Sequence, residues 1–181
     1  VDGTQLTDHT MDIGNGWENS NYLVANKGAY SEISGNKAIQ TLNSAGVVTE
    51  TNDTDVLIEA DWTPTSASDN RGGLILRYDE DATYGNYWEF NIRRDNGDWQ
   101  ILEFTDAIAT VRDSGSFTWN AGQTYRVSFV ARGDALTAFI DGVQVGTYTS
   151  SLYNTHTKHG FQRNGGNNAT TWDNFNVYSL T

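Results

Sequence analysis

Residues 124–148 constrain the fold of this chain more tightly than any other stretch. Apolar and polar residues alternate over 125–130 and again over 136–140, which is the period of a strand with one buried face. Asp141-Gly142 follows the second run and is the pair of residues that two-residue hairpin turns prefer. The stretch therefore predicts an antiparallel meander.

Further strands are predicted on both sides of this meander. The segment 55–62 alternates until Pro64, which cannot donate a hydrogen bond to a ladder, and Gly35-Asn36 turns a hairpin within 29–41. Similar alternation is found in 72–78, 87–93, 99–104 and 174–178, whereas 108–117 is less regular. Because no segment has a sustained 3.6-residue period, we expect an all-β protein. Its 181 residues suit one antiparallel β-sandwich domain spanning 1–181.

The composition excludes several classes of function. A net charge of −12 argues against nucleic acid as a partner, because binding phosphates needs clustered Lys and Arg. The absence of cysteine excludes disulfides and thiolate metal sites. No apolar run is long enough to span a bilayer, so membrane insertion is not expected. The chain begins at Val1 without a signal-like segment, and we expect a processed chain or an excised module.

Several short motifs resemble one known group of proteins. They are Tyr-Arg-Val at 125–127, Ile-Asp-Gly at 140–142, Gly-Leu-Ile-Leu-Arg-Tyr at 73–78, Asn-Tyr-Trp-Glu-Phe at 86–90 and Trp-Asp-Asn-Phe-Asn-Val-Tyr at 172–178. Together they resemble laminin-G-like modules of the concanavalin A-like lectin and glucanase superfamily. Such modules are appended to bacterial polysaccharide-degrading enzymes. The resemblance covers the chain from about Trp17 onward and implies an antiparallel jelly roll.

The resemblance also raises the question of catalysis. Retaining glycosidases of this superfamily carry their carboxylates in a Glu-x-Asp-x-x-Glu pattern. Glu59 and Asp61 begin such a pattern, but Pro64 stands where the second glutamate should be. We therefore expect no enzymatic activity and no catalytic residue.

A polar strand face is the first candidate for ligand binding. If the alternation is unbroken, one face carries Arg77, Tyr87, Glu89, Asn91 and Arg93, and Arg126 extends it. Arginine and carboxylate groups can hydrogen-bond neighbouring sugar hydroxyls, while an aromatic ring offers an apolar platform to a sugar ring. The alternative is an ordinary solvated sheet face with cross-strand ion pairs.

Loop aromatics are the second candidate. Trp119 and Tyr153 lie beside Gly- and Asn-rich turns, where an exposed ring suggests recognition, and Arg163 opens a polar segment that could line a pocket. The alternative is that these rings plug an end of the sandwich, which we prefer for Trp172.

Calcium is the expected cofactor. It is bound by several carboxylate, amide and backbone oxygens, and this acidic chain supplies many of them. The resemblance implies a site that ties the N-terminal segment to the closing strand, here Asp8 or Asp12 with Asp173. The loop 79–81 is a rival site, and all these residues could equally be turn-forming aspartates.

The sequence thus predicts a non-catalytic carbohydrate-binding module, stabilised by calcium. We expect it to be extracellular, as part of a larger secreted enzyme or an adhesin, with a carbohydrate as its partner. The alternative is a structural or adhesion jelly-roll domain of a virion or cell-surface protein.

Overall fold

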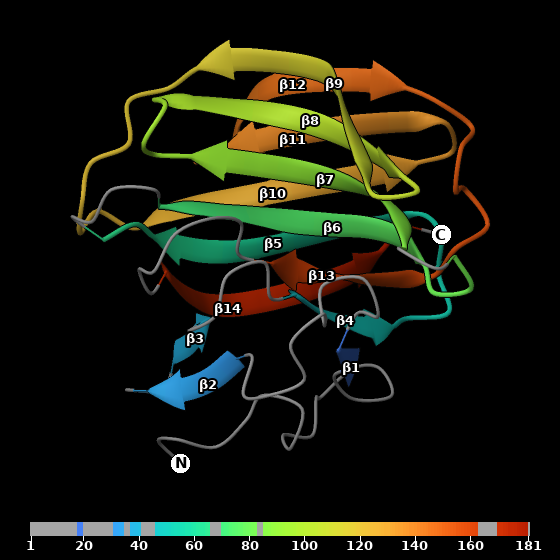
Figure 1. Ribbon diagram of the computed structural model, residues 1–181, viewed down its shortest axis with the longest axis horizontal. Coiled ribbons are helices and arrows are strands. Elements are labelled where there is room, and N and C mark those ends of the chain that lie inside the picture. The colour runs from blue at the N-terminus through green and yellow to red at the C-terminus, as the bar shows by residue number, and fades with distance from the viewer. Residues whose placement is uncertain are drawn as a thin grey trace.

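A computed structural model describes residues 18–19, 31–34, 37–40, 46–65, 70–82, 85–162 and 170–180. These residues contain fourteen strands and no helix, arranged as two antiparallel sheets packed face to face (Figure 1). The prediction of an all-β antiparallel sandwich is confirmed. Within the described ranges, nothing helical has the length and apolarity that crossing a bilayer demands.

Each sheet has seven described strands. The first sheet has the order β1 (Glu18–Asn19), β4 (Gly46–Glu50), β13 (Lys158–Gln162), β6 (Arg71–Asp79), β7 (Asn86–Arg93), β8 (Asp98–Thr105), β9 (Ile108–Ser116). The second sheet has the order β12 (Val143–Thr149), β11 (Ala135–Ile140), β10 (Tyr125–Arg132), β5 (Val56–Thr63), β14 (Thr170–Ser179), β3 (Lys37–Gln40), β2 (Ser31–Ser34).

The predicted meander forms β10, β11 and β12. Strand β10 pairs with β11 on one side and with β5 on the other, so the meander continues into the centre of the second sheet. Asp141 and Gly142 both have positive φ, at 50° and 77°, which is the backbone of the primed hairpin turn that the pair predicts. The hairpin predicted within 29–41 is likewise present as β2 and β3.

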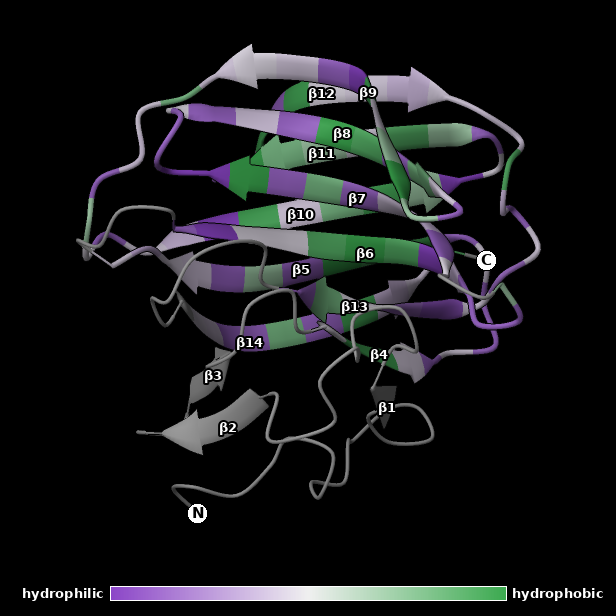
Figure 2. Ribbon diagram, viewed as in Figure 1, coloured by the Kyte–Doolittle hydropathy of each residue, from purple (hydrophilic) through white to green (hydrophobic). Residues whose placement is uncertain are grey.

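The core lies between the sheets and is rich in aromatic rings. Trp62 and Trp119 meet edge to face with ring centroids 5.2 Å apart, and Phe90 of the first sheet packs on Phe129 of the second at 6.0 Å. Apolar residues follow the middle of both sheets, and polar residues gather at the turns (Figure 2). Burying rings from both sheets fixes the strand register, because a slip by one residue would turn them toward solvent.

Strand β7 is buried on both faces, and the two faces belong to different clusters. Trp88 and Phe90 face the second sheet within the main core. Tyr87 faces the other way and joins Ile75 and Tyr78 in a smaller cluster on the outer face of the first sheet. The alternation predicted for this strand is confirmed, and it defines an outer face that is distinct from the core.

The segment 108–117, predicted to be less regular, is instead the nine-residue strand β9. It lies opposite β12 at one side of the sandwich (Figure 1), where a carboxylate oxygen of Asp113 accepts a hydrogen bond from the backbone amide of Thr147 at 2.9 Å. A Cβ on Gly115 or Gly146 would lie 2.5–2.7 Å from the ring of Trp99. The sequence pattern of β9 is weak for two reasons. It is an edge strand, and it carries glycine at position 115, where a side chain would collide with the indole of Trp99.

Candidate functional site

The outer face of the first sheet contains most of the residues that the sequence singled out, but not Arg77. A β-bulge interrupts the pairing of β6 with β7 between Leu76 and Asp79, and Arg77 has a φ of 55°. The bulge reverses the alternation, so Tyr78 rather than Arg77 joins the outer cluster. The prediction that Arg77 shares a face with Glu89 is wrong.

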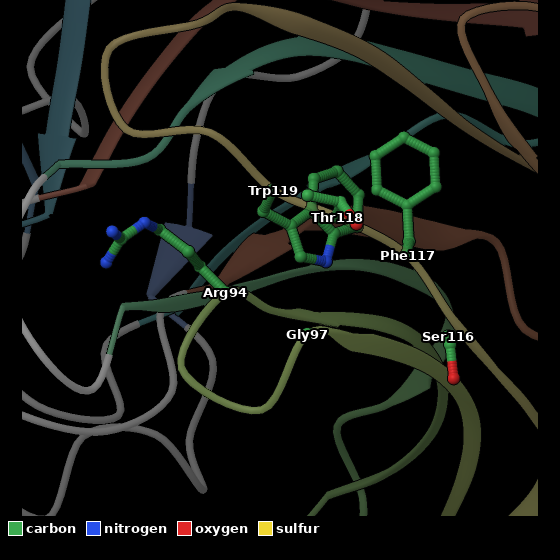
Figure 3. Close-up of a pocket in the computed structure, with 6 residues that line it drawn as sticks. All are labelled: Arg94, Gly97, Ser116, Phe117, Thr118 and Trp119. Atoms are coloured by element: carbon green, nitrogen blue, oxygen red, sulfur yellow. The ribbon is translucent and has the colours of Figure 1, made fainter.

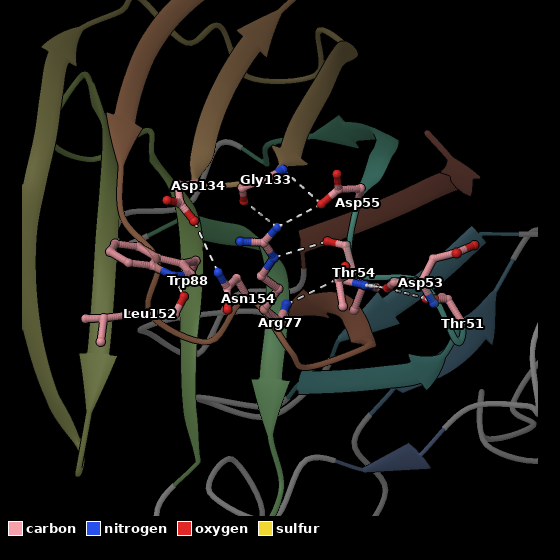
Figure 4. A network of polar contacts seen from close by, with 11 residues as sticks. Thr51, Asp53, Thr54, Asp55, Arg77, Trp88, Gly133, Asp134, Leu152 and Asn154 are labelled. Atoms are coloured by element: carbon pink, nitrogen blue, oxygen red, sulfur yellow. Dashed lines mark hydrogen bonds and ion pairs between the residues drawn. The ribbon is translucent and has the colours of Figure 1, made fainter. Parts of the chain in front are cut away.

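Arg77 instead reaches across the end of the sandwich to the second sheet (Figure 4). Its guanidinium donates to the carbonyls of Thr54 at 3.1 Å and Gly133 at 2.8 Å, and pairs with Asp55 at 3.2 Å. The side chain is fully buried, and this burial lowers its pKa while Asp55 opposes the shift. Arg77 therefore holds three chain segments together, away from the outer face of the first sheet.

A row of polar side chains crosses the outer face of the first sheet. Gln162 of β13 pairs with Gly73 of β6, Gly73 with Asn91 of β7, Asn91 with Gln100 of β8, and Gln100 with Ser114 of β9. Directly paired residues point to the same face of a sheet, and neighbouring strands are about 4.8 Å apart, so the row is roughly 19 Å long. We call Gln162, Asn91, Gln100 and Ser114 the amide row.

Accessibility changes along the amide row. Gln162 is fully buried and Asn91 is 3% exposed, while Gln100 is half-buried and Ser114 is exposed. Neither the amide oxygen nor the amide nitrogen of Gln162 has a hydrogen-bond partner among the described residues. A buried amide without partners is costly, since both its donor and its acceptor are left unsatisfied.

Glu89 lies beside the centre of the row. The Asn91 amide donates to its Oε1 at 2.7 Å, and Oε1 lies only 2.0 Å from where a Cβ on Gly73 would be. Glycine at position 73 thus makes room for the carboxylate, which rests over the backbone of β6. A carboxylate next to three amides offers hydrogen-bond acceptors to a ligand rich in hydroxyl groups.

Aromatic rings and ion pairs border the row on its two sides. Tyr87 stacks on Phe104 with ring centroids 4.5 Å apart and an angle of 12° between the planes. On the other side Arg93 donates to Asp98 through Nε at 2.7 Å, and this hydrogen bond raises the pKa of the guanidinium. Tyr87, Glu89, Asn91 and Arg93 are thus brought together on one face, as the sequence predicts.

Arg126 lies on the opposite side of the molecule. It belongs to β10 in the second sheet, where it binds Glu59 at 2.9 Å and Asp61 at 2.7 Å. The prediction that it extends the same face is wrong, because β10 and β7 belong to different sheets. Asp61 also accepts a hydrogen bond from Asn174 at 2.7 Å.

The same ion pairs bear on catalysis. Both carboxylates that begin the glycosidase pattern, Glu59 and Asp61, are engaged by one arginine, and Pro64 is buried where the second glutamate should stand. A retaining glycosidase needs two carboxyl groups about 5 Å apart, one of them free to attack the sugar. In this strand both carboxylates are paired with Arg126.

The described aromatic residues of the loops are buried or half-buried, and not exposed. Trp119 is 6% exposed, packs on Trp62, and donates from Nε1 to the carbonyl of Asp98 at 3.0 Å. Its prediction as an exposed ring is wrong, because the sandwich end needs a plug there. Tyr153 is half-buried at 6.1 Å from Trp88, and its hydroxyl hydrogen-bonds Thr105. Trp172 is buried, as expected.

The metal predictions concern residues only partly described. Asp8, Asp12 and Arg163 lie outside the described residues. Asp173 lies directly opposite Asp61 in the second sheet. Among the described residues, no group of three or more His, Asp or Glu side chains could hold a metal ion, and this includes the rival loop 79–81.

Sequence reasoning missed Gln162, Gln100 and Ser114. Gln100 falls on a strand whose alternation is visible in the sequence, so its place on the outer face could have been noted. Ser114 lies in the segment 108–117, whose pattern is less regular, and Gln162 lies in β13, which the sequence pattern does not predict as a strand. What the sequence did not reveal was that these strands are neighbours, because β13 and β6 are far apart along the chain. The row exists only through this pairing.

No family model matches this sequence, and no curated protein matches it. Solved structures do match. The carbohydrate binding module CBM66 from Bacillus subtilis superposes with a TM-score of 0.74 at 16% identity, over 92% of this chain and 97% of the other. A β-glucanase from Bacillus licheniformis gives 0.65 at 12% identity, over 98% and 97%. The chain has the concanavalin A-like fold.

A galectin of Caenorhabditis elegans, LEC-6, also shares this fold, with a TM-score of 0.58 at 17% identity over 81% of this chain and 99% of the other. At such identities the likeness is one of architecture, and binding modules and a glucanase both have it. The choice between binding and hydrolysis therefore rests on the side chains.

Proposed function

We propose that this protein is a non-catalytic carbohydrate-binding module whose site is the amide row together with Glu89. The observation that carries the proposal is the register of the amide row, which aligns Gln162, Asn91 and Gln100 on one face and leads to the accessible Gln100 and Ser114. Sugar hydroxyls are both donors and acceptors, so one hydroxyl pair satisfies both atoms of an amide.

The other features of the face fit the same ligand class. Glu89 and Asn91 form a hydrogen-bonded pair in the middle of the row, and Gln100 and Ser114 continue it toward solvent. The binding module and the galectin with this fold support the proposal by analogy. We further propose an extracellular setting, in which the module belongs to a larger secreted enzyme or an adhesin.

A glycan array covering neutral glucans, fructans, xylans and mannans tests the proposal first. We expect saturable binding to a defined set of glycans, and no release of reducing sugar from them. Binding to none of them would overturn the proposed function, and oligomers seen by light scattering would then favour a structural role. Release of product would overturn the non-catalytic assignment.

Gln162→Met gives a sharper test, because it keeps the length of the side chain and removes the amide. Replacing a buried unpaired polar group by an apolar one of similar shape is neutral or stabilising, so the free energy of unfolding should not fall. Loss of the hydrogen bonds to the ligand should weaken binding about tenfold or more. Gln144→Met, on the exposed edge strand β12, is the matched control and should change neither quantity.

The two measurements together separate a binding role from a structural one. If Gln162→Met destabilises the protein and leaves the affinity for the array hit unchanged, Gln162 serves the fold and the proposed site is wrong. Gln100→Ala, at the accessible end of the row, should weaken binding without altering stability.

A further inference from the structure

A concave feature lies at one end of the first sheet, beyond the amide row. It is a pocket of about 460 Å³ between the β7–β8 turn and the segment that follows β9. Its walls are formed by Arg94, Gly97, Ser116, Phe117, Thr118 and Trp119. Figure 3 shows Trp119 between Arg94 and Phe117, with the side chain of Arg94 extending away from the two rings. We call it the end pocket.

Strand β9 connects the end pocket to the amide row. Ser114 pairs with Gln100 in the row, and Ser116, two residues later, pairs with Asp98 and lines the pocket. Residues two apart in a strand point to the same face and are separated by about 7 Å. Both serines are exposed, so an accessible path of hydroxyl groups leads from the row to the pocket.

The chemistry of the end pocket suits a sugar. Thr118 and Ser116 present exposed hydroxyls, and Phe117 presents a half-buried ring whose centroid is 4.3 Å from that of Trp119. An aromatic face beside hydroxyls and a guanidinium is a common way to hold a sugar ring.

The walls of the pocket are also held in place. The amide of Phe117 donates to the carbonyl of Gly97 at 2.9 Å, and the amide of Arg94 donates to the carbonyl of Asn70 at 3.0 Å. These bonds tie the turn to both neighbouring segments. A preformed wall costs less entropy on binding than a loop that must become ordered.

We infer that the end pocket continues the amide row, so that the protein binds an extended oligosaccharide across both and not a single sugar unit. The inference rests on the proposed function, and it adds a second subsite at a named place. It predicts that affinity rises with ligand length until the ligand spans the row and the pocket.

Calorimetry with a disaccharide, a tetrasaccharide and a hexasaccharide, all prepared from the neutral polysaccharide that the array identifies, tests this. For the unaltered protein, the hexasaccharide should bind about tenfold more tightly than the disaccharide, which corresponds to one or two additional hydrogen bonds. Equal affinity for all three lengths would overturn the inference and leave the proposed function standing.

Two substitutions test whether the dependence of affinity on ligand length arises in the end pocket. Thr118→Trp places a large ring in the pocket from an exposed position and removes no buried contact, and Arg94→Gln removes the guanidinium charge. Each should reduce the affinity for the hexasaccharide to that for the disaccharide while leaving the disaccharide affinity unchanged. Thr149→Trp, at an exposed position of β12, is the control and should keep the full dependence on length.

The outcomes are distinct. If Thr118→Trp and Arg94→Gln weaken all three ligands equally, or none of them, the end pocket is not a subsite and the inference fails. If no oligosaccharide of any length binds the unaltered protein, the proposed function fails, and this inference fails with it.

Discussion

The backbone amide of Arg77 donates a hydrogen bond to Nδ1 of His159 at 3.1 Å. The other ring nitrogen, Nε2, lies 2.9 Å from the carbonyl oxygen of Asp53, so it must carry the proton and donate it. The bulge that turns Arg77 away from the outer face thus also fixes the tautomer of a fully buried imidazole. One irregular residue joins β6, β13 and the loop before β5.

This buried imidazole makes stability depend on pH. Burial lowers the pKa of His159 to about 4, from a usual value near 6.5. Between these values the unfolded chain binds a proton that the folded protein does not, so the free energy of unfolding falls as the pH is lowered from about 6.5 to about 4. The loss should reach about 2 kcal/mol at pH 5. Urea unfolding at several pH values measures it.

His159→Gln should flatten this pH dependence, although the variant is expected to be less stable at neutral pH. His156→Gln provides the control, because it removes a half-buried histidine from the loop before β13 and leaves His159 in place. An unchanged slope in His159→Gln would show that another group titrates in this range.

Arg77→Met should destabilise the protein without affecting glycan binding. The change leaves the carbonyls of Thr54 and Gly133 without their donor and Asp55 without its cation, and breaking such a buried network costs on the order of 3 kcal/mol. Arg132→Met, at the exposed end of β10, should cost little. If glycan affinity falls in folded Arg77→Met, Arg77 contributes to the site after all.

The contrast between Arg77 and Glu89 shows when the sequence alone predicts the face of a strand on which a residue lies. Alternation correctly placed Tyr87, Glu89, Asn91 and Arg93 on one face, because β7 is regular throughout. It failed at Arg77, because a bulge depends on the packing of a residue against distant partners and leaves no local pattern. Strand positions were therefore predictable wherever the strand itself contains no bulge.

The site itself was less predictable than the strands. The amide row depends on which strands are neighbours, and the burial of Trp119 depends on the shape of the sandwich end. Neither is encoded in a short window of sequence. Composition and alternation gave the fold class, whereas the pairing of distant strands determines the site.

The turn between β8 and β9 offers a way to stabilise the protein. Asp106 and Ala107 both have positive φ, at 49° and 67°, and alanine is strained in this region whereas glycine is not. Ala107→Gly should raise the free energy of unfolding by about 0.5 kcal/mol, since the relief of strain is partly offset by the greater freedom of glycine in the unfolded chain. Ala109→Gly in β9 lacks that strain and should destabilise. A loss of stability in both variants would show that the turn is not strained.

Calcium stabilisation remains a prediction, and Asp173 is the residue through which to test it. A chelator should lower the melting temperature if an ion binds the folded state, and Asp173→Asn should remove that response. Asp141→Asn is the control, because it removes the same charge at the β11–β12 turn and not at Asp173. This variant should still melt at a lower temperature when the chelator is added. An identical melting curve with and without chelator would exclude a stabilising calcium ion.

The last prediction concerns Gly73, which lies between Gln162 and Asn91 of the amide row. A Cβ at this position would come within 2.0 Å of Glu89 Oε1, so Gly73→Ala must displace the carboxylate and break its hydrogen bond with Asn91. Glycan affinity should fall at least tenfold, and overpacking should cost about 1 to 3 kcal/mol of stability. Gly146→Ala is the matched control, because its Cβ would meet the buried ring of Trp99 at 2.5 Å, away from the row. It should destabilise the protein to a similar extent and retain binding under conditions where it is folded. If both variants lose stability and both bind as the unaltered protein does, Glu89 and Asn91 are not part of the site.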